Sequence, residues 1–169
     1  MPATLDPTET QLVAGLAHDV LARTAPGELA LFPVTSAAYF RDPQAVTARR
    51  AGGDSALGFG TETMVAMAPI ALAVSTEVVR WLMGELRTAL KTQGAAAIDR
   101  AMKRLFGKLV PDDGATKQGG APAAPSLTPR QLADIRERAI SRARQLGLSV
   151  PKAEQMADAV VAAVATTGA

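Results

Sequence analysis

The chain contains no cysteine and only one histidine, His18, in 169 residues. The absence of cysteine excludes a disulfide framework, a thiolate nucleophile and any metal site built from cysteine. A lone histidine also makes a poor zinc ligand, because zinc sites combine several Cys and His side chains. We therefore expect no metal site, and we expect His18 to lie in solvent.

Aromatic residues are scarce, at 4% of the chain, although 48% of the residues are hydrophobic. The core must then be built from Ala, Val, Leu, Ile and Met, which favour packed helices over strands. The sequence therefore predicts an all-α protein in two parts. These are a bundle-like helical domain over residues 1–110 and a helical hairpin over 127–166, joined by a disordered Pro/Gly/Ala linker over 111–126.

An export signal is not evident at the start of the sequence, where MPATLDPTETQ has neither a basic beginning nor an apolar stretch. We expect a cytoplasmic protein, with a peripheral membrane location as the alternative. The net charge is only +2, but residues 77–108 carry seven Lys and Arg against three acidic residues. A region of that charge suits an acidic lipid surface or an acidic partner, as well as a solvated helix face.

The longest apolar stretch covers residues 64–90, and we expect it to found the core. Residues 63–76 carry no charge, as in a helix that is enclosed on every side. From Glu77 onward, charged residues recur on one face and leucines on another, so this half is amphipathic. Pro69 either opens a helix in its first turn or kinks a longer helix.

The same stretch has a second interpretation as a membrane helix. Spanning a bilayer takes about 20 apolar residues, and the uncharged run is shorter than that. In this interpretation residues 64–83 insert, and a basic helix over 95–108 meets lipid headgroups or an acidic partner. The contacting residues would be Arg80, Trp81, Arg87, Lys91, Arg100, Lys103, Arg104 and Lys108.

The N-terminal part shows shorter helical signals. Thr8 and Gln11 have the spacing of a capping box, which predicts a helix that begins there and ends before Pro26 and Gly27. A second short helix is expected over residues 35–40, with Tyr39 and Phe40 as core anchors. Residues 44–60 are expected to form a loop.

That loop contains GGDSALGFG, residues 52–60, in which two short motifs overlap. Its glycines resemble a phosphate-binding loop, but Phe59 and Gly60 stand where that motif needs Lys followed by Ser or Thr. Residues 53–57, GDSAL, resemble the GDSL block of a family of serine esterases, which also needs a downstream histidine. No histidine follows Ser55, so we expect neither a nucleotide site nor an esterase.

The C-terminal hairpin has the clearest local signals in the sequence. Thr128 and Gln131 form a capping box around Pro129, and Gly147 is the expected helix stop. Two such helices cannot bury both apolar stripes alone, so the hairpin should dock on the first domain, on its own copy or on another protein. The candidate interaction residues are Leu132, Ile135, Ala139, Leu146, Met156, Val160 and Val164.

These patterns favour a non-enzymatic interaction or assembly protein, because the chain shows no paired acid and base, thiol or metal cluster. We expect no catalytic residue, no cofactor and no small-molecule substrate, and we expect a protein partner or self-association. The first alternative is the membrane-associated protein. The second is a helix-turn-helix DNA-binding regulator, but Lys152, Glu154, Gln155 and Asp158 make its second helix acidic on balance, so nucleic acid is not the expected partner.

Overall fold

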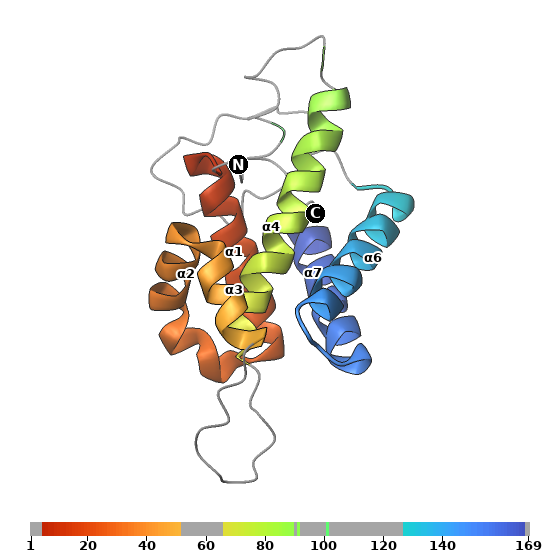
Figure 1. Cartoon of the computed structure of the whole chain (residues 1–169). Coiled ribbons are helices and arrows are strands. Elements are labelled where there is room, and N and C mark those ends of the chain that lie inside the picture. Colours follow the sequence, from red (N-terminus) through yellow and green to blue (C-terminus); the bar gives the residue numbers. More distant parts are fainter. Residues whose placement is uncertain (1–4, 52–65, 90, 92–100, 102–126, 168–169) are drawn as a thin grey trace, which may run out of the picture.

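The structure, a computed structural model, describes residues 5–51, 66–89, 91, 101 and 127–167. Within these ranges the chain is all-α, as the sequence predicts, and contains no strand. The elements are α1 (Pro7–Thr24), the 3₁₀ helix η1 (Pro26–Leu31), α2 (Phe32–Arg41), α3 (Pro43–Ala51), α4 (Met67–Ala89), α6 (Pro129–Gln145) and α7 (Val150–Thr167). Figure 1 shows α2 and α3 on one side of α4, and α6 and α7 on the other.

Helix α1 begins two residues before the predicted position. Its capping box is formed by Asp6 and Glu9, not by Thr8 and Gln11: the Asp6 carboxylate accepts from the Glu9 N–H at 2.7 Å. Asp6 is followed by Pro7, whose fixed φ suits the first helical position, and this places the cap at Asp6. The predicted stripe of Val13, Leu16 and Val20 is fully buried. His18 is exposed, as predicted, and its ring packs edge-on against Phe32.

The prediction of a loop over residues 44–60 is wrong in its first half, because Pro43–Ala51 forms α3. Asp42 and Pro43 end one helix and also begin the next. The Asp42 carboxylate accepts the Ala45 N–H at 2.9 Å, and proline needs no donor at the first helical position. Helix α2 also starts earlier than predicted, at Phe32. The two glycine-loop motifs of residues 52–60 lie outside the described residues.

Helix α4 starts at Met67, so Pro69 opens the helix in its first turn and does not kink a longer one. The first two N–H groups of α4 are bound by one distant carboxylate. Glu28 of η1 accepts from Met67 N–H at 2.7 Å and from Ala68 N–H at 2.9 Å. This bidentate cap satisfies donors that the helix itself leaves unpaired, and it fixes the start of α4 against η1.

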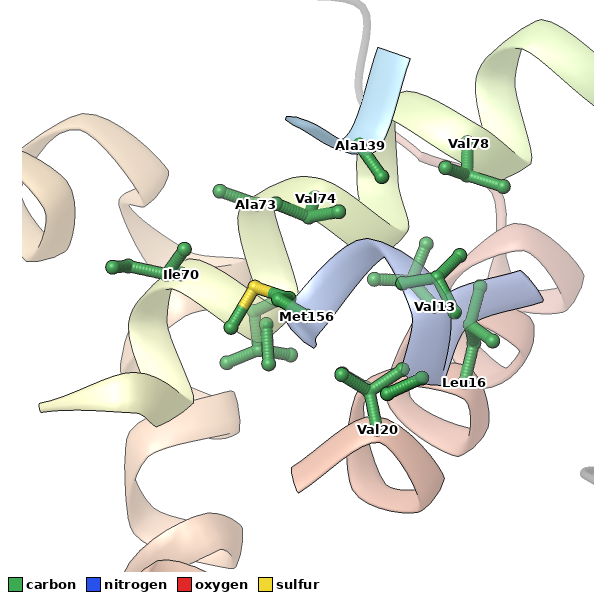
Figure 2. Packing of buried hydrophobic residues seen from close by; sticks show 14 of the residues in the cluster. Val13, Leu16, Val20, Ile70, Ala73, Val74, Val78, Ala139 and Met156 are labelled. Atoms are coloured by element: carbon green, nitrogen blue, oxygen red, sulfur yellow. The ribbon is translucent and has the colours of Figure 1, made fainter. Parts of the chain in front are cut away.

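The core lies among four helices, in which α1 contacts α4, α4 contacts α6, α6 contacts α7, and α7 returns to α1. Figure 2 shows Val13 and Leu16 of α1, Val74 of α4, Ala139 of α6 and Met156 of α7 directed into this shared space. Residues 70–76 of α4 are buried without a break, because α1, α2, α3 and α6 all contact this helix. The part of the uncharged run over residues 70–76 is therefore a core segment.

The residues predicted to begin and end α6 do so in the structure, and Gly147 makes the turn into α7. Thr128 and Gln131 form the predicted capping box, and Gly147 has a φ of 87°, in the left-handed region that glycine adopts without strain. Leu148 N–H donates to Ala143 O at 3.1 Å and Gly147 N–H donates to Arg144 O at 2.9 Å. This is the Schellman arrangement, and the buried Leu148 side chain completes it.

Candidate protein-interaction surface

The predicted interaction stripe of the hairpin packs on its own chain. Ile135, Ala139, Met156 and Val160 are fully buried and Val164 is 1% exposed, all within the cluster that α1 and α4 share. Leu132 and Leu146 are half-buried at its edge. The hairpin was predicted to dock on the first domain, on its own copy or on another protein. In the structure it packs on the N-terminal helices of its own chain. Among the described residues, the outer side of α6 and its junction with α4 are exposed and hollowed.

A groove of about 640 Å³ runs along that junction. It is lined by Trp81 and Glu85 of α4 and by Arg130, Gln131, Asp134, Glu137, Arg138 and Ser141 of α6. The α4 residues are four positions apart, and Arg130, Asp134, Arg138 and Ser141 recur at steps of three or four, so each helix presents one continuous face to the groove. A smaller hollow of about 150 Å³, lined by Glu77, Arg138, Ser141, Arg142 and Gln145, lies beside it.

Trp81, the only tryptophan of the chain, lies half-buried in the groove. The guanidinium carbon of Arg138 lies 5.2 Å from the centre of its ring, within range of a cation–π interaction. The same guanidinium group is 3.9 Å from a carboxylate oxygen of Glu77. Both Arg138 and Glu77 remain substantially exposed, so this ion pair adds little stability. The arrangement holds a flat arginine over an aromatic ring at an open surface.

A buried polar pair fixes α2 against α4 at the neighbouring turn. Tyr39 Oη lies 3.1 Å from Thr76 Oγ1, and the Thr76 hydroxyl donates to Leu72 O at 2.8 Å. Since a threonine hydroxyl has one hydrogen, Tyr39 must be the donor to Thr76. Burial raises the pKa of the Tyr39 phenol above 10.0, although the Thr76 hydroxyl, which can turn to donate to the ionised phenolate, and the charges of Arg142 and Arg80 lower it in part.

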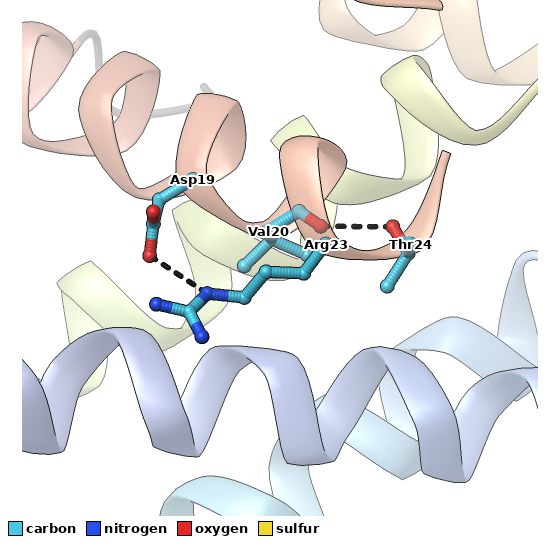
Figure 3. A network of polar contacts seen from close by, with 4 residues as sticks. All are labelled: Asp19, Val20, Arg23 and Thr24. Carbon is cyan, nitrogen blue, oxygen red and sulfur yellow. Dashed lines mark hydrogen bonds and ion pairs between the residues drawn. The ribbon is translucent and has the colours of Figure 1, made fainter. Parts of the chain in front are cut away.

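Polar contacts at the outer surface are local or solvated. Arg136 of α6 donates to Asp158 of α7 at 2.7 Å, and this hydrogen bond raises the pKa of the guanidinium. In α1, Arg23 pairs with Asp19 at 3.2 Å and the Thr24 hydroxyl donates to Val20 O at 2.9 Å, as Figure 3 shows. The hairpin is thus joined at its solvent side by one charged contact.

The residues predicted for membrane or acidic-partner contact do not share one described surface. Trp81 turns toward α6, whereas Arg87 extends to Glu9 of α1, 3.5 Å away. Arg80 and Lys91 are exposed. Arg100, Lys103, Arg104 and Lys108, with the predicted helix over 95–108 and the linker over 111–126, lie outside the described residues. Membrane contact by these side chains stays a prediction.

The described ranges contain neither a cluster of metal ligands nor a helix that could span a membrane. No cluster of three or more His, Cys, Asp or Glu side chains there could hold a metal ion. None of the helices in those ranges is both long enough and apolar enough to cross a bilayer. Comparisons with protein families, curated proteins and solved structures found no match to this chain.

The sequence names Trp81 only as a candidate membrane or acidic-partner contact, and it predicts neither the groove nor the residues of α6 that line it. Trp81 stands out as the single tryptophan, but nothing local to it indicates that Arg138, 57 positions later, covers its ring. The spacing of Arg130, Asp134 and Arg138 on one face of α6 was a readable signal. It describes any solvated helix face equally well, so it could not identify a groove.

Proposed function

We propose that this chain is a non-enzymatic interaction module that binds another protein in the α4–α6 groove. The observation that carries the proposal is the contact between Trp81 and Arg138 at an open, half-buried position. Tryptophan and arginine dominate the binding energy of protein interfaces, because each offers a large flat surface together with a hydrogen-bonding group.

The charges around Trp81 indicate the chemistry of the partner. Arg130 and Arg138 face the groove together with Glu85, Asp134 and Glu137, so charges of both signs line it. A mixed surface of this kind suits a helix with complementary charges better than an anionic lipid surface or a nucleic acid, in which negative charge predominates. An amphipathic helix laid between α4 and α6 is the expected mode of binding.

Site-specific photo-cross-linking in the source cells tests this function. A photoreactive residue in place of Glu85, on the α4 side of the groove, should give a discrete cross-linked protein. The same probe in place of Ala48, exposed on α3 across α4 from the groove, should not. Arg138→Glu should remove the Glu85 product, since it places a carboxylate over the ring of Trp81. Equal products at both positions, or a Glu85 product that Arg138→Glu leaves intact, would reject the groove as the binding site.

A further inference from the structure

Three exposed charges follow one another along α6, and two of them, Arg130 and Glu137, also line the edge of the α4–α6 groove. Arg130, Glu137 and Arg144 are seven residues apart, so they fall on one stripe two turns from one another. All three are exposed, and none takes part in an ion pair within the described ranges. Half-buried Ile140 and exposed Ser141 lie between Glu137 and Arg144 and help to line a hollow of about 670 Å³.

We propose that a second copy of this chain binds on this stripe, with the two α6 helices antiparallel and crossing at Ile140 and Ser141. Glu137 of each copy then faces Arg144 of the other, so a two-fold axis generates two opposite-charge pairs around an apolar centre. The inference goes beyond the proposed function, because the crossing at Ile140 lies in this hollow of α6 and not in the groove beside Trp81.

The charge order along the stripe selects this register. A parallel pair would place Glu137 against Glu137, and like charges directly opposed are unfavourable. An antiparallel pair centred on Ala133 and Asp134 would also match Arg130 with Glu137. However, it would bring two Asp134 carboxylates together and leave no large apolar side chain at the crossing. Only the crossing at Ile140 joins complementary charges to an apolar contact.

The strength of the pairing follows from its small size. One helix face per copy buries less surface than a standard protein interface, so the dimer should form and dissociate reversibly. The charged pairs decide which register forms and contribute less to the affinity itself.

Charge reversal tests the pairing in the purified full-length chain by sedimentation velocity over a concentration series. Glu137→Arg and Arg144→Glu should each weaken the dimer by about tenfold, because each creates two like-charge contacts. An equimolar mixture of the two variants should dimerise like the wild type, since one copy then carries two positive charges and the other two negative charges. The double variant with both reversals should also behave like the wild type.

Arg130→Glu is the matched control, because Arg130 lies on the same stripe but beyond the partner's α6 in this register. It should leave the dimer unchanged. A wild-type chain that stays monomeric at its solubility limit, a mixture that fails to dimerise, or an Arg130→Glu effect equal to that of Glu137→Arg would each overturn the proposal. If the chain is monomeric while the Glu85 probe still captures another protein, the inference fails and the proposed function stands.

Discussion

At the scale of single residues, two polar contacts between distant parts of the chain set the position of α4. The Tyr39 phenol binds Thr76 in the middle of the helix, and the Glu28 carboxylate binds the N–H groups of Met67 and Ala68 at its start. Tyr39 is predicted as a core anchor by its size, and it is buried. The role of Glu28 could not be predicted, because its partners lie 39 and 40 residues away in the sequence.

The chain has one tyrosine, so the absorbance of tyrosinate reports on Tyr39 alone. In the native protein this phenol should ionise above pH 10.0, and it should shift to its ordinary pKa on denaturation. A folded pKa above the unfolded one gives stability that is present below pH 10 and lost as pH rises through the folded pKa. Tyr39→Phe should therefore show a shallower loss of stability at alkaline pH. A native titration curve that coincides with the denatured one would show that Tyr39 is solvated.

Removal of the Glu28 carboxylate should weaken the start of α4. Glu28→Ala should lower the free energy of unfolding by about 1–2 kcal/mol, because two helix N–H groups lose their acceptor. Glu85→Ala, an exposed glutamate of α4 with no ion pair in the described ranges, should change it by less than about 0.5 kcal/mol. Urea denaturation of the two variants gives the comparison, and equal effects would contradict the cap.

At the scale of elements, the ends of α6 are predicted correctly, whereas the cap of α1 is predicted two residues too late although it is equally local. Thr128, Pro129 and Gly147 define α6 because each acts on its own helix through steric fit or a local hydrogen bond. Helix α3 was not predicted, because Asp42 and Pro43 indicate the end of α2. The same dipeptide also caps the helix that follows. An Asp-Pro dipeptide marks the end of a helix in the sequence, but it does not show whether a loop or another helix follows.

Substitution by alanine should change the stability of the protein in opposite directions at Gly147 and at Gly84. Gly147 has positive φ, so Gly147→Ala should destabilise the protein by about 1 kcal/mol or more, although nothing lies within 4 Å of the added Cβ. Gly84 lies exposed in α4 with equally open space. Gly84→Ala should stabilise the protein by about 0.5–1 kcal/mol, because alanine loses less backbone freedom on folding. Thermal denaturation measures both changes, and a shift of the same sign in the two variants would be inconsistent with these backbone conformations.

Val74 distinguishes a core helix from a membrane helix. Val74 is fully buried among the four helices, so Val74→Lys should unfold the chain by burying an unpaired charge. Ala89→Lys, at the exposed end of α4, should leave it folded. Circular dichroism combined with liposome flotation measures both properties. Retained helix with lost lipid binding would instead favour insertion of residues 64–83.

At the scale of the whole molecule, the two predicted parts of the chain contribute to one core. Sequence patterns showed which faces of α6 and α7 are apolar, but not that α1 and α4 cover them, because stripes such as Ile135 and Ala139 fit any apolar surface of the right shape. The groove, too, results from a contact between helices that the sequence patterns do not show. The groove exists only because α4 and α6 are held side by side, and the proposed binding depends on that contact.

Equilibrium unfolding in urea tests this contact most directly, because Trp81 lies at the α4–α6 junction and is the only tryptophan. If the hairpin and the N-terminal helices share one core, Trp81 fluorescence and far-ultraviolet circular dichroism should follow a single transition with the same midpoint. A fluorescence transition that is complete at lower urea, while most of the helical signal remains, would show that α6 separates from α4 independently. That result would contradict both the shared core and the groove.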